Sequence, residues 1–497
     1  MSTVNTINAN ITTIGPGDHG YDGFVEVGDG VMVNPGITVA VGGAGAHGIF
    51  SNVAVSVVSV GSGALVSSTQ GIGIALTGLV NGSVGGGAVV VDSNATVAGA
   101  QYGVTLDGSS NLIRNSGTIR GATGAKIGGN FASGNIIQQS ASGSIIGTGA
   151  DSHGLDIVGD ALVENAGLIQ GSISGITFRL GRALTLVNEG TIQGSTAVNV
   201  SSSMAISKIL NYGHIEGAIL LGNESDVYEG RGGSVTGTVF MGGGNDKFFG
   251  STGAEAIDPG LGNDTIDGGG GADVVLYFDN RANYAIVSNP DRSFTITSAG
   301  GDTDVLRNVR SVRFDDAEFA LAFNLAGTSG ANAIVGGWGD DTLSGNAGND
   351  TLNGDRGADQ LIGGTGNDRL NGGYDNDTLD GGTGNDILTG GTGNDTFVFK
   401  DRLSTTGNVD KISDYNRSYD SLQLDNRYMP KLGAAGRLSS AKFVLGPKAL
   451  DANDHLIYDR AKGYLYYDGD GSGSAAQVLI AQFTNKAVLT YSEFTVI

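Results

Sequence analysis

Apolar and polar residues alternate in short runs over most of the first 240 residues, and the runs recur with a loose period. The pattern Asn-x-Gly-x-Ile-x-Gly begins at Asn115, Asn165, Asn188 and Asn211, and the last three copies start 23 residues apart. An alternating apolar stretch precedes each copy, and a small residue with further apolar alternation follows it. Three short strands per period predict the coil of a parallel β-helix, because each coil leaves an apolar row that only the next coil can cover.

The asparagine at a fixed place in each coil predicts a stacked ladder, whose amides satisfy backbone groups of the turns above and below. Eight or nine coils spaced by ~4.8 Å would form a rod roughly 40 Å long. Over about residues 30–235 the pattern resembles the passenger solenoids of bacterial autotransporters and adhesins. That resemblance implies an architecture and leaves the function open.

From residue 241 the period shortens to nine. A first array of four units starts at Met241, and a second array of eight units runs in register from Gly327 to Val398. The eighth position of the second array is apolar in every unit: Ile334, Leu343, Leu352, Leu361, Leu370, Leu379, Leu388 and Phe397. One apolar residue in nine is too few for a helix stripe or a half-buried strand. It predicts a narrow roll with a core of single-file side chains.

The nine-residue unit reads Gly-Gly-x-Gly-x-Asp-x-U-x, where U is apolar. Glycines permit positive φ and let backbone carbonyls crowd inward, and Ca²⁺ takes six to eight oxygen ligands from carbonyls and carboxylates. The predicted metal-binding carboxylates are Asp246, Asp264, Asp273, Asp341, Asp350, Asp359, Asp368, Asp377, Asp386 and Asp395. The predicted metal-binding glycines are Gly243, Gly337, Gly339, Gly364, Gly366, Gly382, Gly384, Gly391 and Gly393.

Two units make one turn of such a roll, so alternate units lie on one edge and can share an ion. This predicts about eight Ca²⁺ ions, with six sites in the second array and two in the first. Asn332 and Glu255 also occupy sixth positions, but Asn332 lacks the charge and Glu255 is one methylene longer. Neither is predicted as a ligand. Asp375 replaces a fourth-position glycine.

Over residues 241–398 these units resemble the hemolysin-type calcium-binding (RTX) repeat. The resemblance implies a chain that stays unfolded at the low calcium of the cytosol and folds outside the cell. Residues 277–326 resemble the segment often found between such arrays, and residues 399–497 resemble the end of serralysin-like and rhizobial RTX proteins. In that region Asp468 and Asp470 form either one further calcium loop or a tight acidic turn without metal.

The chain ends in Glu493-Phe-Thr-Val-Ile497, an acid followed by apolar residues. This ending resembles the uncleaved C-terminal signal of type I secretion and implies that the secretion machinery is a partner. The first basic residue is Arg114, so a Sec or Tat signal is not expected. We therefore expect a secreted protein, extracellular or held at the cell surface.

The sequence predicts an all-β chain of five parts. They are a parallel β-helix (1–240), a first array (241–276), a β-rich insert (277–326), a β-roll (327–398) and a small β-rich C-terminal cap (399–497). Glycine supplies 88 of the 497 residues, which suits short strands and tight turns. There is no cysteine, and no apolar run reaches the ~18 residues that a membrane span needs.

The formal net charge is −23, and the two arrays together carry −14 of it. Nucleic-acid binding is disfavoured, because it needs basic groups against the phosphates. Acids at this density repel each other unless a cation lies between them. The charge distribution thus agrees with calcium as the cofactor.

The first half contains no His-Glu-x-x-His zinc helix, no Gly-x-Ser-x-Gly elbow and no phosphate-binding glycine loop. The best local group for acid–base chemistry is Asp151, His153 and Asp156, with Asp160 and Glu164 nearby. Such chemistry needs groups that converge across one cleft, so no catalytic residue is assigned, and none is assigned to His19, His47, His214 or His455. Aromatic residues that would form sugar platforms are scarce.

The leading interpretation is an adhesin or extracellular scaffold that binds a cell-surface or polysaccharide ligand. The alternative is a polysaccharide lyase, hydrolase or epimerase with its active site on the β-helix. A pore-forming toxin ranks third, because the sequence contains no hydrophobic membrane-inserting segment.

Overall fold

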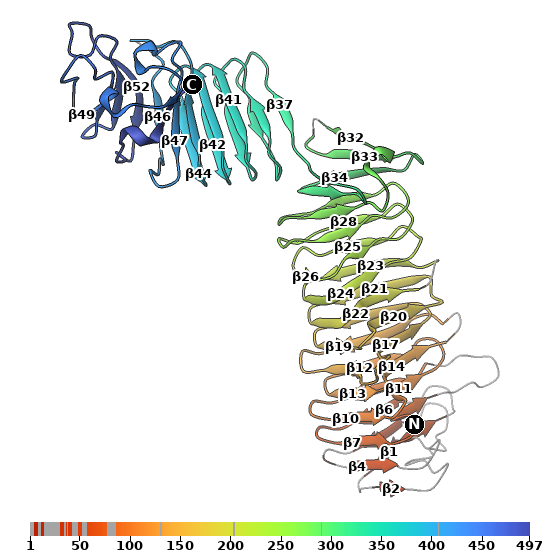
Figure 1. The fold of residues 1–497 in the computed structure, drawn as a ribbon. Coiled ribbons are helices and arrows are strands. Elements are labelled where there is room, and N and C mark those ends of the chain that lie inside the picture. Colours follow the sequence, from red (N-terminus) through yellow and green to blue (C-terminus); the bar gives the residue numbers. More distant parts are fainter. Residues whose placement is uncertain are drawn as a thin grey trace. The chain divides into compact units, whose positions relative to one another are not determined.

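The computed structural model describes residues 4–7, 11–13, 30–33, 36, 38–41, 48–51, 57–76, 86–129, 132–201, 204–289, 291–405 and 407–497. His19 and His47 lie outside this part of the chain. The described residues form strands and four short 3₁₀ turns and contain no α-helix, so the predicted all-β class is confirmed. The chain divides into two compact units, the first of residues 1–287 and 293–318 and the second of 288–292 and 319–497 (Figure 1).

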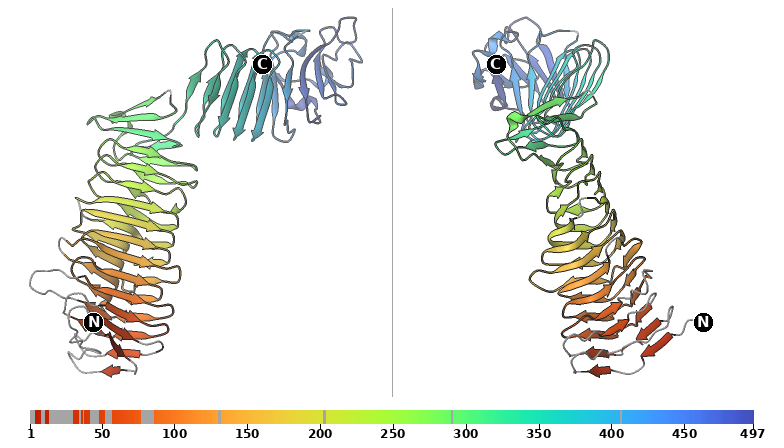
Figure 2. Two further views of the ribbon diagram at one scale, coloured as in Figure 1. Left: turned by 180° about the vertical axis from the view of Figure 1, so that it is seen from behind. Right: turned by 90° about the vertical axis from the view of Figure 1, so that its right-hand side faces the viewer.

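Unit 1 is a parallel β-helix with three strands in each regular coil. One sheet stacks the strands that end at the repeated asparagine or, in β15, at Gln139: β12 (Leu112–Asn115), β15 (Asn135–Gln139), β18 (Ala161–Asn165), β21 (Ala183–Asn188) and β23 (Ile206–Asn211). The other sheet contains β13 (Thr118–Gly121), β16 (Ser144–Gly147) and β19 (Leu168–Gln170), and also β11 (Tyr102–Leu106), β14 (Thr123–Gly128), β17 (His153–Val158) and β20 (Ser174–Arg179). Figure 2 shows these strands stacked coil upon coil. The predicted solenoid is confirmed.

The asparagine ladder is also confirmed. The Asn165 amide donates to Asn188 Oδ1 at 2.8 Å, and Asn188 donates to Asn211 Oδ1 at 2.8 Å. Gln139 continues the ladder by donating to Asn165 Oδ1 at 2.9 Å. These amides are buried, and they also bind turn backbone, as where Asn165 accepts from Gly167 N–H. Each rung therefore satisfies polar groups that the turns would otherwise leave unpaired.

The first nine-residue array continues the same solenoid. Strands β25 (Val227–Glu229), β28 (Lys247–Phe249), β30 (Thr265–Asp267) and β34 (Thr303–Arg307) follow β23 in parallel register. The amide ladder ends where Asn211 donates to the Tyr228 hydroxyl at 3.4 Å, and the Tyr228 ring stacks on Phe248 at 5.0 Å. Aromatic stacking thus replaces the amide ladder inside the coil, where the 23-residue repeat ends and the nine-residue repeat begins.

Unit 2 begins with a parallel β-roll whose rungs are 18 residues apart. One sheet contains β37 (Asn324–Ala326), β39 (Thr342–Ser344), β41 (Gln360–Thr365), β43 (Thr378–Thr383) and β45 (Thr396–Phe399). The facing sheet contains β38 (Ala333–Val335), β40 (Thr351–Asp355), β42 (Arg369–Tyr374) and β44 (Ile387–Thr392). The eighth-position side chains fill the space between the sheets and are 9% exposed or less. This is the single-file core that the spacing predicts.

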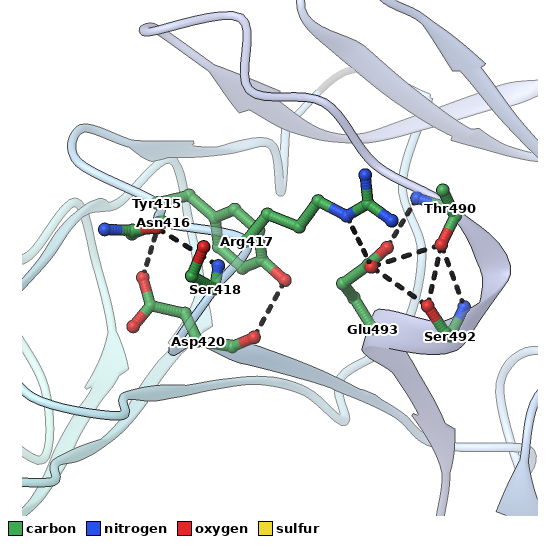
Figure 3. Close-up of polar contacts among 8 residues, drawn as sticks. All are labelled: Tyr415, Asn416, Arg417, Ser418, Asp420, Thr490, Ser492 and Glu493. Carbon is green, nitrogen blue, oxygen red and sulfur yellow. Dashed lines mark hydrogen bonds and ion pairs between the residues drawn. The ribbon is translucent and has the colours of Figure 1, made fainter.

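The C-terminal region extends both sheets of the roll. Strands β46 (Asp410–Ile412) and β52 (Val478–Phe483) continue one sheet, while β47 (Ser421–Leu424) and β53 (Phe494–Val496) continue the other. The core widens here, and Tyr415 meets Phe483 edge-on at 5.3 Å. A 3₁₀ turn, Tyr491–Glu493, leads into β53, and Glu493 binds the Thr490 N–H and the Arg417 guanidinium (Figure 3). No helix in the described residues is long and apolar enough to cross a membrane.

Candidate metal sites

The sixth-position carboxylates form ladders along the edges of the roll. In each rung one oxygen, Oδ1, accepts the backbone N–H of the sixth-position residue 18 places earlier. The distances from the backbone N of the first residue to Oδ1 of the second are 2.7 Å for Asp341 and Asp359, 2.7 Å for Asp350 and Asp368, 2.9 Å for Asp359 and Asp377, 2.7 Å for Asp368 and Asp386, and 3.0 Å for Asp377 and Asp395. The first array repeats the contact at 2.8 Å, from Asp246 to Asp264 and from Glu255 to Asp273. The carboxylates are thus held in register by the backbone of the preceding rung.

The second oxygen of these carboxylates, Oδ2, is buried and has no hydrogen-bond partner in eight of them. The eight are Asp246, Asp264, Asp273, Asp350, Asp359, Asp368, Asp377 and Asp386. Their side chains are 2% exposed or less. A buried carboxylate oxygen without a partner loses its hydration and gains nothing in return. Eight such atoms in a periodic series therefore mark places where a cation fits.

In six of these eight units a glycine at the first position leaves room beside the Oδ2 atom, whereas Met241 and Pro259 hold that position before Asp246 and Asp264. A Cβ added to Gly372 would lie 2.2 Å from Asp377 Oδ2, and one added to Gly363 would lie 2.6 Å from Asp368 Oδ2. The same Cβ atoms would approach the carbonyl oxygens of Gly390 and Gly381 within 2.6 Å and 2.4 Å. Carboxylate and carbonyl oxygens thus surround one small space, and these are the donors that Ca²⁺ prefers.

At several ladder ends the protein itself satisfies the second oxygen. Asp341 Oδ2 accepts the Gly337 N–H, Asp304 Oδ2 accepts the Tyr277 hydroxyl at 2.9 Å, and Asp420 Oδ2 accepts the Asn416 N–H at 2.7 Å (Figure 3). The Glu255 carboxylate binds the hydroxyl and the N–H of Ser251. Asn332 Oδ1 accepts the Thr328 N–H at 2.6 Å. The group includes Asp341, a predicted metal ligand, as well as Asn332 and Glu255, which were not predicted as ligands; for all three, the role in metal binding stays a prediction.

Burial shifts the acid–base equilibrium of the unpartnered carboxylates. Loss of solvation, together with the neighbouring Asp341 and Asp377 carboxylates, raises the pKa of Asp359 to about 8. Burial likewise raises the pKa of Asp264 to about 8, of Asp377 to about 7 and of Asp386 to about 6. The folded arrays therefore disfavour charged carboxylates unless a cation neutralises them.

The turns use left-handed backbone at the second and fourth positions of most units. Among the predicted glycine ligands this holds for Gly364, Gly366, Gly382, Gly384, Gly391 and Gly393. Asn346 and Asp375 stand at such positions with φ of 68° and 73°, since Asn and Asp are the side chains that tolerate this region best. Asp375 therefore preserves the turn in which it replaces glycine.

The other three predicted glycines lie differently. Gly243 holds the third position between two left-handed glycines and bridges to Leu261. The turn of Gly337 and Gly339 is not left-handed at either residue. Gly337 points its N–H at Asp341 Oδ2 instead.

Among the residues that the structure describes, no three Asp, Glu, His or Cys side chains converge on one point. A cation beside each Oδ2 must therefore take most of its ligands from turn carbonyls. Glycine-rich turns provide such carbonyls, and Ca²⁺ accepts them readily. The donor set fits calcium better than zinc, which takes cysteine and histidine ligands in its structural sites.

Comparison with known proteins agrees with this chemistry. The family model of the RTX calcium-binding nonapeptide repeat matches residues 242–275, 326–361 and 362–397. The chain carries RTX calcium-binding repeats. The RTX repeats lie where the ladders of unpartnered carboxylates lie, in both units of the structure. No curated protein matches the chain as a whole.

Among solved structures, the extracellular lipase LipA from Serratia marcescens matches at 17% identity with a TM-score of 0.18. The match covers 59% of this chain and 40% of the lipase. This chain therefore spans less than half of the lipase's length.

Four acids that the repeat pattern does not predict extend the carboxylate ladders. Asp226 accepts the Ser207 N–H before the first array, and Asp304 accepts the Asp264 N–H at 3.0 Å after it. Asp410 and Asp420 accept the N–H groups of Asp386 and Asp395, both at 3.1 Å, beyond the second array. Each stands in an Asp-x-apolar triplet, as the repeat acids do. Searching for this triplet without the glycines would have found them.

Residues considered for catalysis lie on β17 and the adjacent turns. His153 Nδ1 lies 3.0 Å from the Thr177 hydroxyl, and Asp156 forms an ion pair with Arg179 at 2.9 Å. Burial lowers the pKa of His153 and raises that of Asp156. Asp160 Oδ1 accepts the Arg182 N–H at 2.6 Å. Each of the three is thus tied to its own local partner.

The Asp468–Asp470 turn is held by its own backbone. Asp468 Oδ1 accepts the Asp470 N–H at 3.1 Å, and Asp470 Oδ2 accepts the Ala475 N–H at 3.0 Å. Gly471, at φ 65°, allows the chain to reverse there. A further calcium loop at this turn stays a prediction.

Replacing Gly372 by Ala is expected to raise the calcium concentration at half-folding of the second array about tenfold. The added methyl would displace Asp377 Oδ2 or a backbone carbonyl, and such overpacking typically costs ~1–3 kcal/mol. Calcium titration of the full chain, followed by circular dichroism, measures this shift. The matched control is Gly330→Ala, where an added Cβ meets nothing within 4 Å. Equal midpoints for the two variants would contradict the proposed space beside Oδ2.

Proposed function

We propose that this protein is exported unfolded, folds its RTX arrays on meeting calcium outside the cell, and acts there as an adhesin or extracellular scaffold. The observation that carries the proposal is the series of eight buried, unpartnered Oδ2 atoms. Weak calcium modules outside cells work at millimolar calcium, far above cytosolic levels. Calcium then becomes the condition for folding, as metal does in other small metal-dependent domains.

The position of the C-terminus supports export before folding. Strand β53 lies between β47 and the short strand β48 (Gly436–Arg437) and pairs with both, and Phe494 and Val496 are 0% and 1% exposed. A secretion signal in Glu493–Ile497 is accessible to an exporter only while this strand is unpaired. Folding around calcium would then bury the signal after export and make release one-way.

An adhesin or scaffold suits unit 1 better than an enzyme does. His153 and Asp156 are bound to Thr177 and Arg179, so they do not face each other as an acid–base pair would. A stacked solenoid instead offers long outward faces of regular strands, which repeat proteins commonly use for binding.

Deleting Glu493–Ile497 is expected to keep the chain inside a host that carries a type I exporter, because the signal is lost. Immunoblots of medium and cells measure the exported fraction. Arg417→Ala serves as the control: it breaks the 3.1 Å ion pair to Glu493 but leaves the terminal residues intact, so its export should equal that of the natural chain. Equal export of the truncated chain would contradict the proposed route.

The ligand role is tested on polysaccharide-coated surfaces in the presence of calcium. Retention of the intact chain without release of new sugar ends supports the adhesin or scaffold. Release of reducing or unsaturated sugar ends that His153→Ala abolishes would instead establish the enzyme alternative.

A further inference from the structure

A surface cavity of about 300 Å³ opens on unit 1 beside β14, β17 and β20. Two acids, Asp107 and Asp156, and two bases, Lys126 and Arg179, line it. No residue of the calcium arrays contributes to it. The cavity therefore needs an explanation separate from metal binding.

One column of polar residues crosses the coils beneath this cavity. In four successive strands the parallel register aligns Thr105, Lys126, Asp156 and Thr177. The residues that flank Asp156 in its strand, Leu155 and Ile157, are fully buried apolar side chains of the coil interior. Because side chains alternate along a strand, the column points away from that interior.

Two atoms of this column are buried without partners. Asp156 is 5% exposed, and its Oδ2 accepts from Arg179 at 2.9 Å while its Oδ1 has no hydrogen bond. Thr105 is also 5% exposed, and its hydroxyl has no partner. Lys126, between them in register, is half-buried and forms no ion pair with any residue that the structure describes. Such groups cost free energy unless a polar ligand meets them.

Apolar groups form another part of the wall. Tyr102 is half-buried at the cavity, and Leu180 is 62% exposed with φ of 54°. A bulky residue in the left-handed region is strained, and such strain gathers at binding sites. Gly128 at the cavity lets two coils approach closely, since a Cβ there would lie 1.9 Å from the Val158 carbonyl oxygen. The cavity thus combines unpartnered polar atoms with exposed apolar surface.

We propose that this cavity binds one unit of an uncharged saccharide. A sugar hydroxyl can donate to Asp156 Oδ1 and another can accept from Lys126, while the C–H face of the ring covers Tyr102. The two acids and two bases of the wall cancel in charge, and the chain's net −23 repels polyanions. This inference rests on the proposed adhesin role and names its ligand class.

The test is isothermal titration of the calcium-loaded full chain with cellohexaose, xylohexaose and chitohexaose, and with hexagalacturonate as the charged comparison. We expect binding of at least one neutral oligosaccharide. Lys126→Ala and Tyr102→Ala should each weaken it about tenfold, the loss of one hydrogen bond to a charged group or one ring contact. Lys208→Ala, an exposed lysine of β23 outside the cavity, should bind as the natural chain does.

Three outcomes would overturn the proposal. They are no binding of any neutral oligosaccharide, unchanged binding by both cavity variants, and preference for hexagalacturonate. Circular dichroism checks that each variant folds. If no saccharide binds, the proposal of calcium-driven folding is unaffected, because folding is measured separately by chelation. If saccharide binds but the arrays stay folded after chelation, only the folding proposal is refuted.

Discussion

Chelation of calcium from the full chain at pH 8 is expected to unfold the second array and leave the long coils of unit 1 intact. Five of the unpartnered Oδ2 atoms lie in that array. When the free calcium concentration is ten times the Kd of a site, binding at that site adds about 1.4 kcal/mol to the free energy of unfolding, so five sites add about 7 kcal/mol. Stabilities of whole domains are typically ~5–15 kcal/mol, and the single-file core offers little apolar area to offset the loss.

The only tryptophan, Trp338, lies in the second array and stacks on Arg356 at 4.0 Å. Its emission should shift to the red on chelation and return with Ca²⁺ but not with Mg²⁺, which prefers octahedral sites that keep water ligands. Hydrogen exchange should accelerate over 327–398 and stay slow over 132–201. Unchanged emission and exchange after chelation would show that the array folds without metal.

Acid should refold the metal-free array. Burial raises the pKa of Asp386 to about 6, of Asp377 to about 7 and of Asp359 to about 8, against the ordinary 3.8. Between the ordinary pKa of the unfolded chain and the raised pKa values of the folded chain, the folded chain binds more protons than the unfolded chain. The stability of the folded array therefore falls as the pH rises. The contribution is complete below pH ~4, is lost progressively as the pH rises, and is gone above about pH 8, the highest of the raised pKa values.

In EDTA, the Trp338 emission should therefore be native-like near pH 5 and unfolded near pH 8. With calcium present the same scan should stay native-like up to pH 8, because the ion replaces the protons. Asp355→Asn is the matched control: it changes one exposed carboxylate in a left-handed position that Asn also tolerates, so its midpoint should not move. Metal-free stability that rises with pH would reverse the sign and contradict the account.

Much of the fold follows from periodicity. The 23-residue spacing predicted three strands per coil and the asparagine ladder, and the nine-residue spacing predicted the roll with its leucine file. Gln139 escaped prediction because it replaces the asparagine, and because two extra residues separate it from Ile145, the counterpart of the repeated isoleucine. Asp226 and Asp410 escaped because their rungs keep the Asp-x-apolar triplet without the glycines.

The distinction between carboxylates with and without a free oxygen lies beyond the sequence. Asp341 and Asp359 occupy the same position in similar units. The Gly337 N–H binds Oδ2 of Asp341, whereas Oδ2 of Asp359 has no hydrogen-bond partner. The difference comes from the backbone of the Gly337 turn, which is not left-handed. The cavity at Asp156 is likewise invisible in the sequence, because its walls come from separate coils that only the parallel register brings together.

The central claim is that the unpartnered Oδ2 atoms are calcium ligands. Anomalous scattering from crystals grown in calcium tests it most directly. The account predicts an ion beside Oδ2 of each of the eight carboxylates from Asp246 to Asp386, and none at Glu255 or Asn332. Ions placed elsewhere, or an array that is folded with these oxygens bound to water alone, would contradict it.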